Sequence, residues 1–264
     1  HFRRLFIPLR AARYPLQNKL WFLHGNLQTP KVWTQFKDTF TNLLDSGNRR
    51  RFELEMVNLW EQVADGFLPW AEQFCKEVSG KQVHPDQSQW IIGYSLGGRL
   101  ALHAIVQEPC LWTGAIIVGA DPGLTDEQEK MKRLRVDQEW GQRFLKKPWN
   151  DLTREWDNQP VFAGRPNSAP RDENDFNRNQ VARIFDKFSS GRQQNLIPVL
   201  SRLSSPPIIY ISGGEDSKCC EIGCRLEKAC PTITHAIIPS AAHRVPWENP
   251  ILFSQIVQDF INSV

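Results

Sequence analysis

The stretch Trp90-Ile91-Ile92-Gly93-Tyr94-Ser95-Leu96-Gly97-Gly98-Arg99-Leu100 joins a short apolar run to a Gly-x-Ser-x-Gly pentapeptide and then to a helical pattern. This is the strand–turn–helix context of a nucleophile elbow, a turn so tight that small residues must flank the serine. Gly93 and Gly97 supply them here. The Ser95 hydroxyl would stand at the end of a sheet, beside a helix N-terminus that favours negative charge. The apolar run and the helix disfavour the alternative of a chance match in a surface loop.

Outward from the elbow, strand-like and helix-like segments alternate along the chain. Apolar runs predict strands at 20–23, 52–59, 89–93, 113–118, 207–212 and 233–238, and weak alternation over 2–9 predicts an opening edge strand. Helical spacing predicts helices at 31–45, 67–78, 97–107 and 249–261. The alternation predicts an α/β fold with a mostly parallel sheet and helices on both faces.

The pattern changes between 121 and 205. Thr125 and Gln128 resemble a capping box at the start of a long charged helix, and interrupted helical signals follow. We expect a helical insertion at 121–205, lying over the carboxyl ends of the strands, where open α/β sheets bind ligands. The core would then comprise 1–120 and 206–264.

Composition limits the cellular environments and the classes of partner that we expect for this protein. The 264 residues carry a net charge of +3 with interspersed charges, which is too little for a nucleic-acid partner. Four of six cysteines cluster at 219–230 without paired zinc-site spacing, so reduced thiols in a cytoplasmic protein are expected. No stretch is long enough to span a membrane, no signal-peptide pattern begins the chain, and nothing indicates a metal or cofactor. The oligomeric state stays open.

A serine nucleophile or base needs an imidazole to take its proton and a carboxylate to fix the imidazole tautomer. In chain order after Ser95, Asp216 follows a predicted strand and His243 lies in the loop after the next one. Glu215 is the rival carboxylate. The rival histidines are His24, His84, His103 and His235, none of which follows the last strand.

Two further features belong to the predicted site. Backbone N–H groups of Leu96, after the serine, and of Asn26, after the strand at 20–23, would form an oxyanion hole. Arg99 lies one helical turn after Ser95, so it either binds a substrate carboxylate or forms an interdomain salt bridge.

The chain resembles a branch of the α/β-hydrolases, the 2-succinyl-6-hydroxy-2,4-cyclohexadiene-1-carboxylate synthases of menaquinone and phylloquinone (vitamin K) biosynthesis. The elbow and Phe22-Leu23-His24-Gly25 are generic to the superfamily. The more specific stretches are Pro122-Gly123-Leu124, Arg133-x-Arg135-x-Asp137, Trp140-x-Gln142-Arg143-Phe144-Leu145 and Trp156-x-x-Gln159-Pro160-Val161-Phe162-Ala163. Gly214-Glu215-Asp216-Ser217-Lys218 and His243 with Glu248-Asn249-Pro250 complete the resemblance.

The resemblance implies a lyase that eliminates pyruvate from 2-succinyl-5-enolpyruvyl-6-hydroxy-3-cyclohexene-1-carboxylate, a small polycarboxylate. Ser95 would abstract a ring proton, activated by His243 and oriented by Asp216, without being acylated. The pocket would be lined by Tyr94, Arg99, Arg133, Trp156 and Phe162. From the residues alone, a salt bridge for Arg133, core packing for Trp156 and Phe162, and hydrogen bonding within the elbow for Tyr94 would be preferred.

The chain departs from the family's pattern at several pocket positions. Asn26 and Asp157 stand where aromatic residues are common, Ala242 replaces the glycine before the catalytic histidine, and Asn58-Leu59-Trp60-Glu61-Gln62 replaces a Pro-Gly-His-Gly turn. A third cap arginine has no clear counterpart, although Lys187 or Arg183 could serve. A serine esterase or thioesterase with an acyl-enzyme is the alternative enzyme, and a non-catalytic binding protein is disfavoured by the complete set of Ser95, Asp216 and His243.

Overall fold

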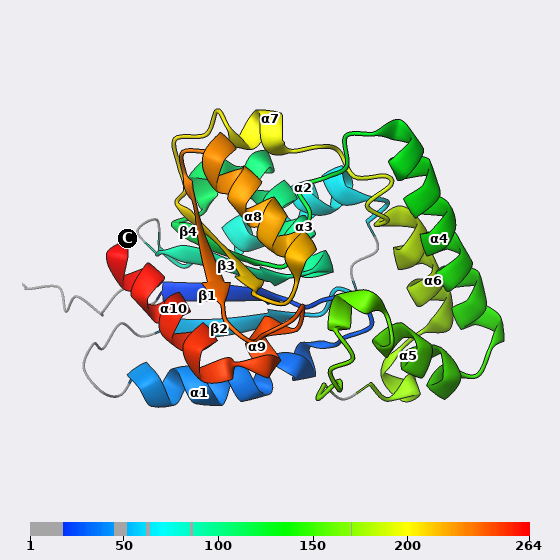
Figure 1. Ribbon diagram of the computed structural model, residues 1–264. Helices are drawn as coiled ribbons and strands as arrows, with labels where there is room; N and C mark the ends of the chain where they lie inside the picture. Colours follow the sequence, from blue (N-terminus) through cyan, green and yellow to red (C-terminus); the bar gives the residue numbers. More distant parts are fainter. Residues whose placement is uncertain (1–17, 45–51, 62–63, 85–86, 170) are drawn as a thin grey trace, which may run out of the picture.

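One parallel sheet forms the centre of the molecule. The computed structural model describes residues 18–44, 52–61, 64–84, 87–169 and 171–264 (Figure 1). Six strands pair in the order β2-β1-β3-β4-β5-β6, and every pairing is parallel. The strands are β1 (Asn18–Leu23), β2 (Phe52–Val57), β3 (Gln89–Tyr94), β4 (Gly114–Val118), β5 (Ile208–Gly213) and β6 (Ile233–Ile238). The edge strand predicted at 2–9 lies outside the described residues.

The strands agree with the predicted ones except at their ends. Central strands β1, β3, β4 and β5 are buried along their whole length, as expected for strands covered on both faces. Strand β2 ends at Val57 rather than Leu59 because Asn58 begins a turn. The Asn58 carbonyl accepts from the Glu61 N–H and its side-chain oxygen accepts from the Trp60 N–H.

Helices cover both faces of the sheet (Figure 1). On one face, α2 (Phe67–Gly80), α3 (Leu96–Gln107) and α8 (Ser217–Ala229) bury their apolar sides against side chains such as Trp21. On the other, α1 (Thr34–Leu44), the short α9 (Val245–Glu248) and α10 (Pro250–Ser263) pack against Phe22 and its neighbours. Trp21 and Phe22 face opposite ways because successive strand side chains alternate.

The segment between β4 and β5 carries the remaining helices. These are α4 (Glu127–Lys146), α5 (Trp149–Asp157), α6 (Arg178–Lys187) and α7 (Ile197–Leu200), with 3₁₀ turns η3 (Pro160–Phe162) and η4 (Glu173–Asp175). Helices α4 and α6 pack against each other, and α4, α5 and α6 stand to one side of the sheet in Figure 1. Two short 3₁₀ turns, η1 (Pro30–Trp33) and η2 (Pro109–Leu111), lie elsewhere.

The predicted capping box at the start of α4 is wrong by one residue. The N-cap is Asp126, whose carboxylate accepts from the Glu129 N–H at 2.8 Å, so Thr125 and Gln128 do not form the cap. A carboxylate at this position also interacts favourably with the helix dipole, which a threonine hydroxyl does not.

All six cysteines are free thiols, two of them exposed. Across the described segments, no helix combines the length and apolar character that crossing a bilayer requires.

Candidate active site

The elbow holds Ser95 in a backbone conformation that few residues adopt. Ser95 has φ 51° and ψ −109°, its N–H donates to the Val118 carbonyl of β4, and it immediately precedes α3. The flanking glycines have no room for a side chain. A Cβ on Gly93 would lie 2.4 Å from the Gly97 carbonyl oxygen, and one on Gly97 would lie 2.3 Å from the Leu23 carbonyl oxygen. The turn therefore presents the serine side chain at the carboxyl end of β3.

Asp216, His243 and Ser95 form one hydrogen-bonded line. The His243 Nδ1 lies 2.6 Å from the Asp216 Oδ2, and its Nε2 lies 3.3 Å from the Ser95 Oγ. The second Asp216 oxygen accepts from the Cys219 N–H and caps α8. Burial alone would raise the pKa of Asp216, but the hydrogen bonds from His243 and Cys219 outweigh it and hold the pKa below its usual value. An ionised Asp216 keeps the proton of His243 on Nδ1, which leaves Nε2 free to accept the serine proton.

The rival groups are engaged elsewhere. Glu215 pairs with Arg165 at 2.6 Å. His24 spans two loops, since its Nδ1 lies 2.9 Å from the Gly25 carbonyl oxygen and its Nε2 accepts from the Leu59 N–H. His103 is buried against the Phe67 ring, and the Nε2 of His235 lies 2.8 Å from the Ser212 Oγ. His84 lies in the loop between α2 and β3.

Two backbone N–H groups are available at the predicted oxyanion hole. Among the described residues, neither the Asn26 N–H nor the Leu96 N–H donates a hydrogen bond to the protein. The neighbouring N–H groups do: Gly25 donates to the Gln28 side chain at 2.9 Å, and Gly97 donates to the His24 carbonyl at 3.0 Å. Both free donors belong to residues at the carboxyl ends of adjacent strands, β1 and β3.

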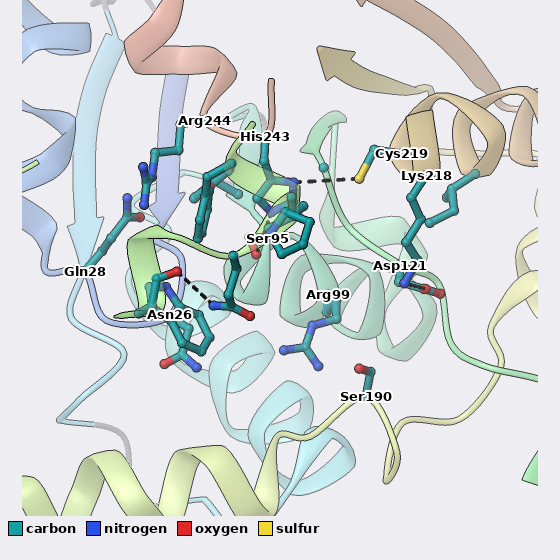
Figure 2. Close-up of a pocket in the computed structure, with 18 of the residues that line it drawn as sticks. Asn26, Gln28, Ser95, Arg99, Asp121, Ser190, Lys218, Cys219, His243 and Arg244 are labelled. Carbon is teal, nitrogen blue, oxygen red and sulfur yellow. Dashed lines mark hydrogen bonds and ion pairs between the residues drawn. The ribbon is translucent and has the colours of Figure 1, made fainter. Parts of the chain in front are cut away.

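A cavity of about 270 Å³ opens over Ser95 (Figure 2). Its wall includes Asn26, Tyr94, and the two triad residues Ser95 and His243. Side chains from the segment between β4 and β5 complete the wall. Within the part of the chain that the structure describes, five basic side chains line it against a single carboxylate. The basic residues are Arg99, Arg133, Arg171, Lys218 and Arg244, and the acid is Asp121. The cavity therefore favours a small anion with several negative groups.

Arg99 reaches the cavity from α3 on the far side of Ser95 from Arg244 (Figure 2). Its Nη1 donates to the Phe188 carbonyl at 2.8 Å, so its partner is a backbone group rather than the carboxylate of a salt bridge. Burial lowers the pKa of Arg99 to about 10, which leaves it protonated near neutral pH. The guanidinium also lies over the Phe67 ring, 5.5 Å from its centroid, and no ion pair of Arg99 is found among the described residues. A buried cation of this kind is well suited to bind a ligand carboxylate.

The aromatic residues named from the sequence surround the triad. The Tyr94 ring lies 5.4 Å from the His243 ring, and burial raises the pKa of its hydroxyl, which stays neutral. The Phe162 ring lies 5.9 Å from the same imidazole. Trp156, on α5, lines the cavity while packing edge-to-face on Trp140 at 5.2 Å. Pocket lining and aromatic packing coexist for these side chains.

The basic residues suggested from the segment between β4 and β5 divide into two groups. Arg133 lines the cavity and also pairs with Asp137 on the next turn of α4, at 2.7 Å. Lys187 and Arg183 do not line it, and both lie close to Asp65 instead, at 3.3 and 3.5 Å. The cavity wall contains Arg171 and Arg244 as additional arginines.

Three of the basic cavity residues were missed from the sequence. Arg244 directly follows His243, and Lys218 lies two residues after Asp216 within the stretch Gly214–Lys218, so proximity in sequence could have indicated both. Arg171 belongs to an irregular segment without periodicity, and only the folded chain brings it to the cavity.

One group of side chains could approach a metal ion. Asp216, Cys219 and His243 place donor atoms within 4.8 Å of one another, the one such group among the described residues. Burial strongly raises the pKa of the Cys219 thiol, so the thiolate that a metal requires is disfavoured. Asp216 and His243 already bind each other, which fits a triad better than a metal centre.

Comparison with known proteins adds the family. A curated protein from Escherichia coli O1:K1, named 2-succinyl-6-hydroxy-2,4-cyclohexadiene-1-carboxylate synthase, is 31% identical over 190 residues, which cover 70% of this chain and 72% of that protein. No protein-family model matches the chain.

Solved structures show the same fold. MenH from S. aureus superposes with a TM-score of 0.77 at 18% identity, covering 93% of this chain and 94% of that one. The peroxisomal alpha-beta-hydrolase Lpx1 from Saccharomyces cerevisiae gives a TM-score of 0.62 at 15% identity, covering 96% and 78%. The predicted α/β-hydrolase fold is thus confirmed.

Proposed function

Because this chain belongs to the family of 2-succinyl-6-hydroxy-2,4-cyclohexadiene-1-carboxylate synthases, we propose that it eliminates pyruvate from 2-succinyl-5-enolpyruvyl-6-hydroxy-3-cyclohexene-1-carboxylate. The observation that carries the proposal is the line from Asp216 through His243 to Ser95, within a cavity whose described walls hold five basic side chains. The product would be an intermediate of menaquinone or phylloquinone biosynthesis.

The elimination requires a base at one ring carbon and a leaving group at another. The proton leaves the ring carbon that bears the succinyl group, where the adjacent ketone makes it acidic. The electron pair forms a double bond within the ring, the existing ring double bond shifts by one position, and the bond from the ring to the enolpyruvyl oxygen breaks. The enolate of pyruvate takes up a proton to become pyruvate, so atoms and charges balance.

The three polar residues divide the work. His243 accepts the Ser95 proton at Nε2, so that the Ser95 oxygen can take the ring proton. Asp216 fixes the imidazole tautomer through Nδ1 and stabilises the imidazolium that forms. No bond forms between Ser95 and the substrate, so these residues act as a base rather than as a nucleophile with its activator.

Removing the ring proton places negative charge on the succinyl ketone oxygen. The N–H groups of Asn26 and Leu96 have no acceptor among the described residues, so they can donate to this oxygen. Donors fixed in advance stabilise charge that develops in the transition state without having to reorganise. The Leu96 N–H also stands at the N-terminus of α3, where the helix dipole adds to the effect.

The cavity cations would hold the substrate's carboxylates. Arg99 binds one carboxylate on its side of Ser95, with Arg133 and Lys218 contributing positive charge. We also propose that residues 121–205 act as a cap on a core of 1–120 and 206–264, because Arg133, Trp156 and Phe162 come from this segment. The core would then carry the chemistry and the cap much of the substrate selection. Free thiols at all six cysteines support a cytoplasmic location.

Pyruvate release tests the proposal directly. The substrate is generated enzymatically and its release of pyruvate is followed with lactate dehydrogenase and NADH, against an enzyme-free control for spontaneous loss. Wild type should exceed that control strongly, and Ser95→Ala should not exceed it by more than a small factor. Ser79→Ala, on the exposed side of α2, is the matched control and should behave as wild type. Wild-type release at the enzyme-free rate would refute the function.

A further inference from the structure

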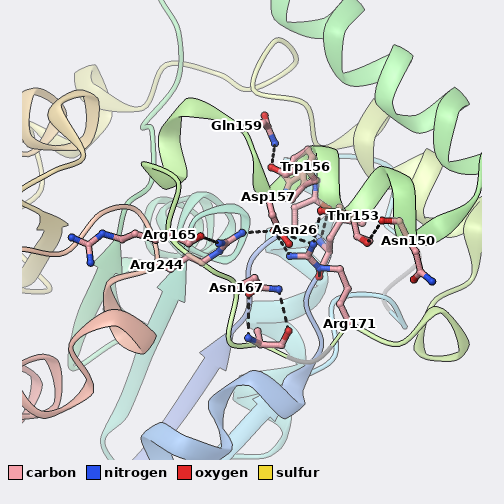
Figure 3. Close-up of polar contacts among 12 residues, drawn as sticks. Asn26, Asn150, Thr153, Trp156, Asp157, Gln159, Arg165, Asn167, Arg171 and Arg244 are labelled. Carbon is pink, nitrogen blue, oxygen red and sulfur yellow. Dashed lines mark hydrogen bonds and ion pairs between the residues drawn. The ribbon is translucent and has the colours of Figure 1, made fainter.

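One carboxylate serves two buried arginines at a wall of the cavity (Figure 3). The Arg171 Nη1 and Nη2 each lie 3.1 Å from the Asp157 Oδ1, and the Arg244 Nη2 donates to the same oxygen. The side chains of Arg171 and Arg244 are only 7% and 3% exposed. Two guanidinium groups and one carboxylate leave an excess positive charge where solvent screens it little, and such a charge favours an additional anion.

The excess charge faces the cavity. Arg171 and Arg244 line it, and Asp157 does not. The nearby carboxylates Glu215 and Glu248 share a single arginine, Arg165, which makes the wider group neutral, but none of these three residues lines the cavity.

Arg244 also has hydrogen-bonding capacity to spare. A guanidinium carries five N–H donors. Within the described residues, the Arg244 side chain donates only to Asp157 and to the Arg165 carbonyl, the latter at 3.3 Å. Its guanidinium carbon lies 3.7 Å from the centroid of the Phe162 ring, which also lines the cavity.

The position of Arg171 and Arg244 relative to the oxyanion hole indicates which part of a ligand would reach these two arginines. The Arg171 Nε donates to the Leu27 carbonyl at 3.0 Å, and Leu27 directly follows Asn26. A succinyl ketone held by the Asn26 and Leu96 N–H groups would start its chain beside this wall. Arg99 lies on the opposite side of Ser95 (Figure 2), so it would hold a different carboxylate.

We propose that Arg171 and Arg244, held together by Asp157, form a second carboxylate subsite that binds the terminal carboxylate of the succinyl chain. This inference rests on the proposed function for the identity of the ligand. The competing interpretation is that the three residues only fasten α5 to the two loops beneath it.

A pair of ligands separates the two interpretations without requiring turnover. The probe 2-succinylbenzoate carries a ring carboxylate and the succinyl chain, and 2-butanoylbenzoate carries a methyl group in place of the terminal carboxylate. Binding of each is measured by calorimetry with Ser95→Ala, which leaves the subsite intact. The Arg244→Gln and Arg171→Gln variants are then compared in that background. Arg154→Gln removes an exposed arginine charge from α5 and is the matched control.

The subsite predicts that the parent protein binds 2-succinylbenzoate about tenfold or more tightly than 2-butanoylbenzoate, as expected for a hydrogen-bonded charge pair. Arg244→Gln should bind the two ligands nearly equally. Arg154→Gln should keep the ratio of the two affinities that the Ser95→Ala parent shows, called here the parental ratio. If Arg244→Gln does not fold, Arg171→Gln tests the same expectation. Equal affinities in the parent, or a parental ratio in a folded Arg244→Gln or Arg171→Gln variant, overturn the subsite.

The experiments distinguish a failure of this inference from a failure of the proposed function. Discrimination between the two ligands by a protein that releases no pyruvate would overturn the function and leave a dicarboxylate-binding subsite. Fast pyruvate release by wild type together with an unchanged ratio in folded Arg244→Gln would overturn the subsite and leave the function.

Discussion

Replacing Asp216 with asparagine separates the two jobs that this carboxylate performs. One oxygen accepts from the Cys219 N–H at 3.0 Å and caps α8, and the other accepts from His243 at 2.6 Å. An asparagine can keep its oxygen on the Cys219 N–H, so the cap survives at a cost below about 1 kcal/mol from the lost charge. Its NH₂ group then faces His243 and forces the imidazole proton onto Nε2, the atom that must accept from Ser95.

The expected result is a large loss of rate with little loss of stability. Asp216→Asn should lower kcat for pyruvate release on the order of 10⁴-fold, the size of effect that a wrong histidine tautomer has in a serine triad. Asp216→Ala should lose a similar rate and also about 1 kcal/mol of cap stability, measured by urea unfolding. Glu215→Gln is the matched control, because Glu215 is the neighbouring carboxylate and pairs with Arg165. An Asp216→Asn enzyme that keeps a tenth of wild-type kcat would refute the assigned role.

Two further predictions concern Arg99 and His103. Arg99→Gln should lower kcat/KM for pyruvate release about 10- to 100-fold, because a charged hydrogen bond to a substrate carboxylate is lost; a change under threefold in the coupled assay would contradict this. Burial, reinforced by repulsion from Arg99, lowers the pKa of His103 from 6.5 to about 4, so its folded state resists protonation. The stability present above pH 6.5 is therefore lost as the pH falls toward 4, by about 3 kcal/mol from this group. His103→Leu should reduce the fall in unfolding free energy between pH 7 and pH 4 by about that amount in urea titrations, and an unchanged fall would show that His103 is not buried in its neutral form.

The fold and the elbow could be predicted because local chemistry determines them. Runs such as Trp90–Ile92 and Ile208–Ile211 are too apolar for a surface strand, so they indicate a sheet covered on both faces. The spacing of Gly93 and Gly97 around Ser95 is required by contacts with backbone carbonyls. The proximity of Ser95, Asp216 and His243 follows from parallel strands β3, β5 and β6 ending at one edge of the sheet.

The cavity wall could not be predicted in the same way. The partner of Arg99 is the Phe188 carbonyl, which neither a carboxylate clamp nor a salt bridge anticipates, because it depends on how the segment between β4 and β5 folds back. Arg171 lies in a segment with no helical or strand period, so no pattern signals its position. Asp65 attracts Lys187 and Arg183 away from the cavity, and no local rule pairs residues so distant in sequence.

Three of the departures named from the sequence, Asn26, Asp157 and Ala242, belong to one continuous set of contacts. The Asn26 side chain accepts from the Leu27 N–H, the Leu27 carbonyl accepts from Arg171, and Arg171 binds Asp157. Asp157 in turn binds Arg244, whose N–H donates to the same Glu248 carboxylate that accepts from the Ala242 N–H. Residues in one hydrogen-bonded network couple energetically, so a change at Asp157 is expected to affect both Arg171 and Arg244. An aromatic residue at position 157 would leave the buried Arg171 and Arg244 guanidinium groups without the carboxylate that they share.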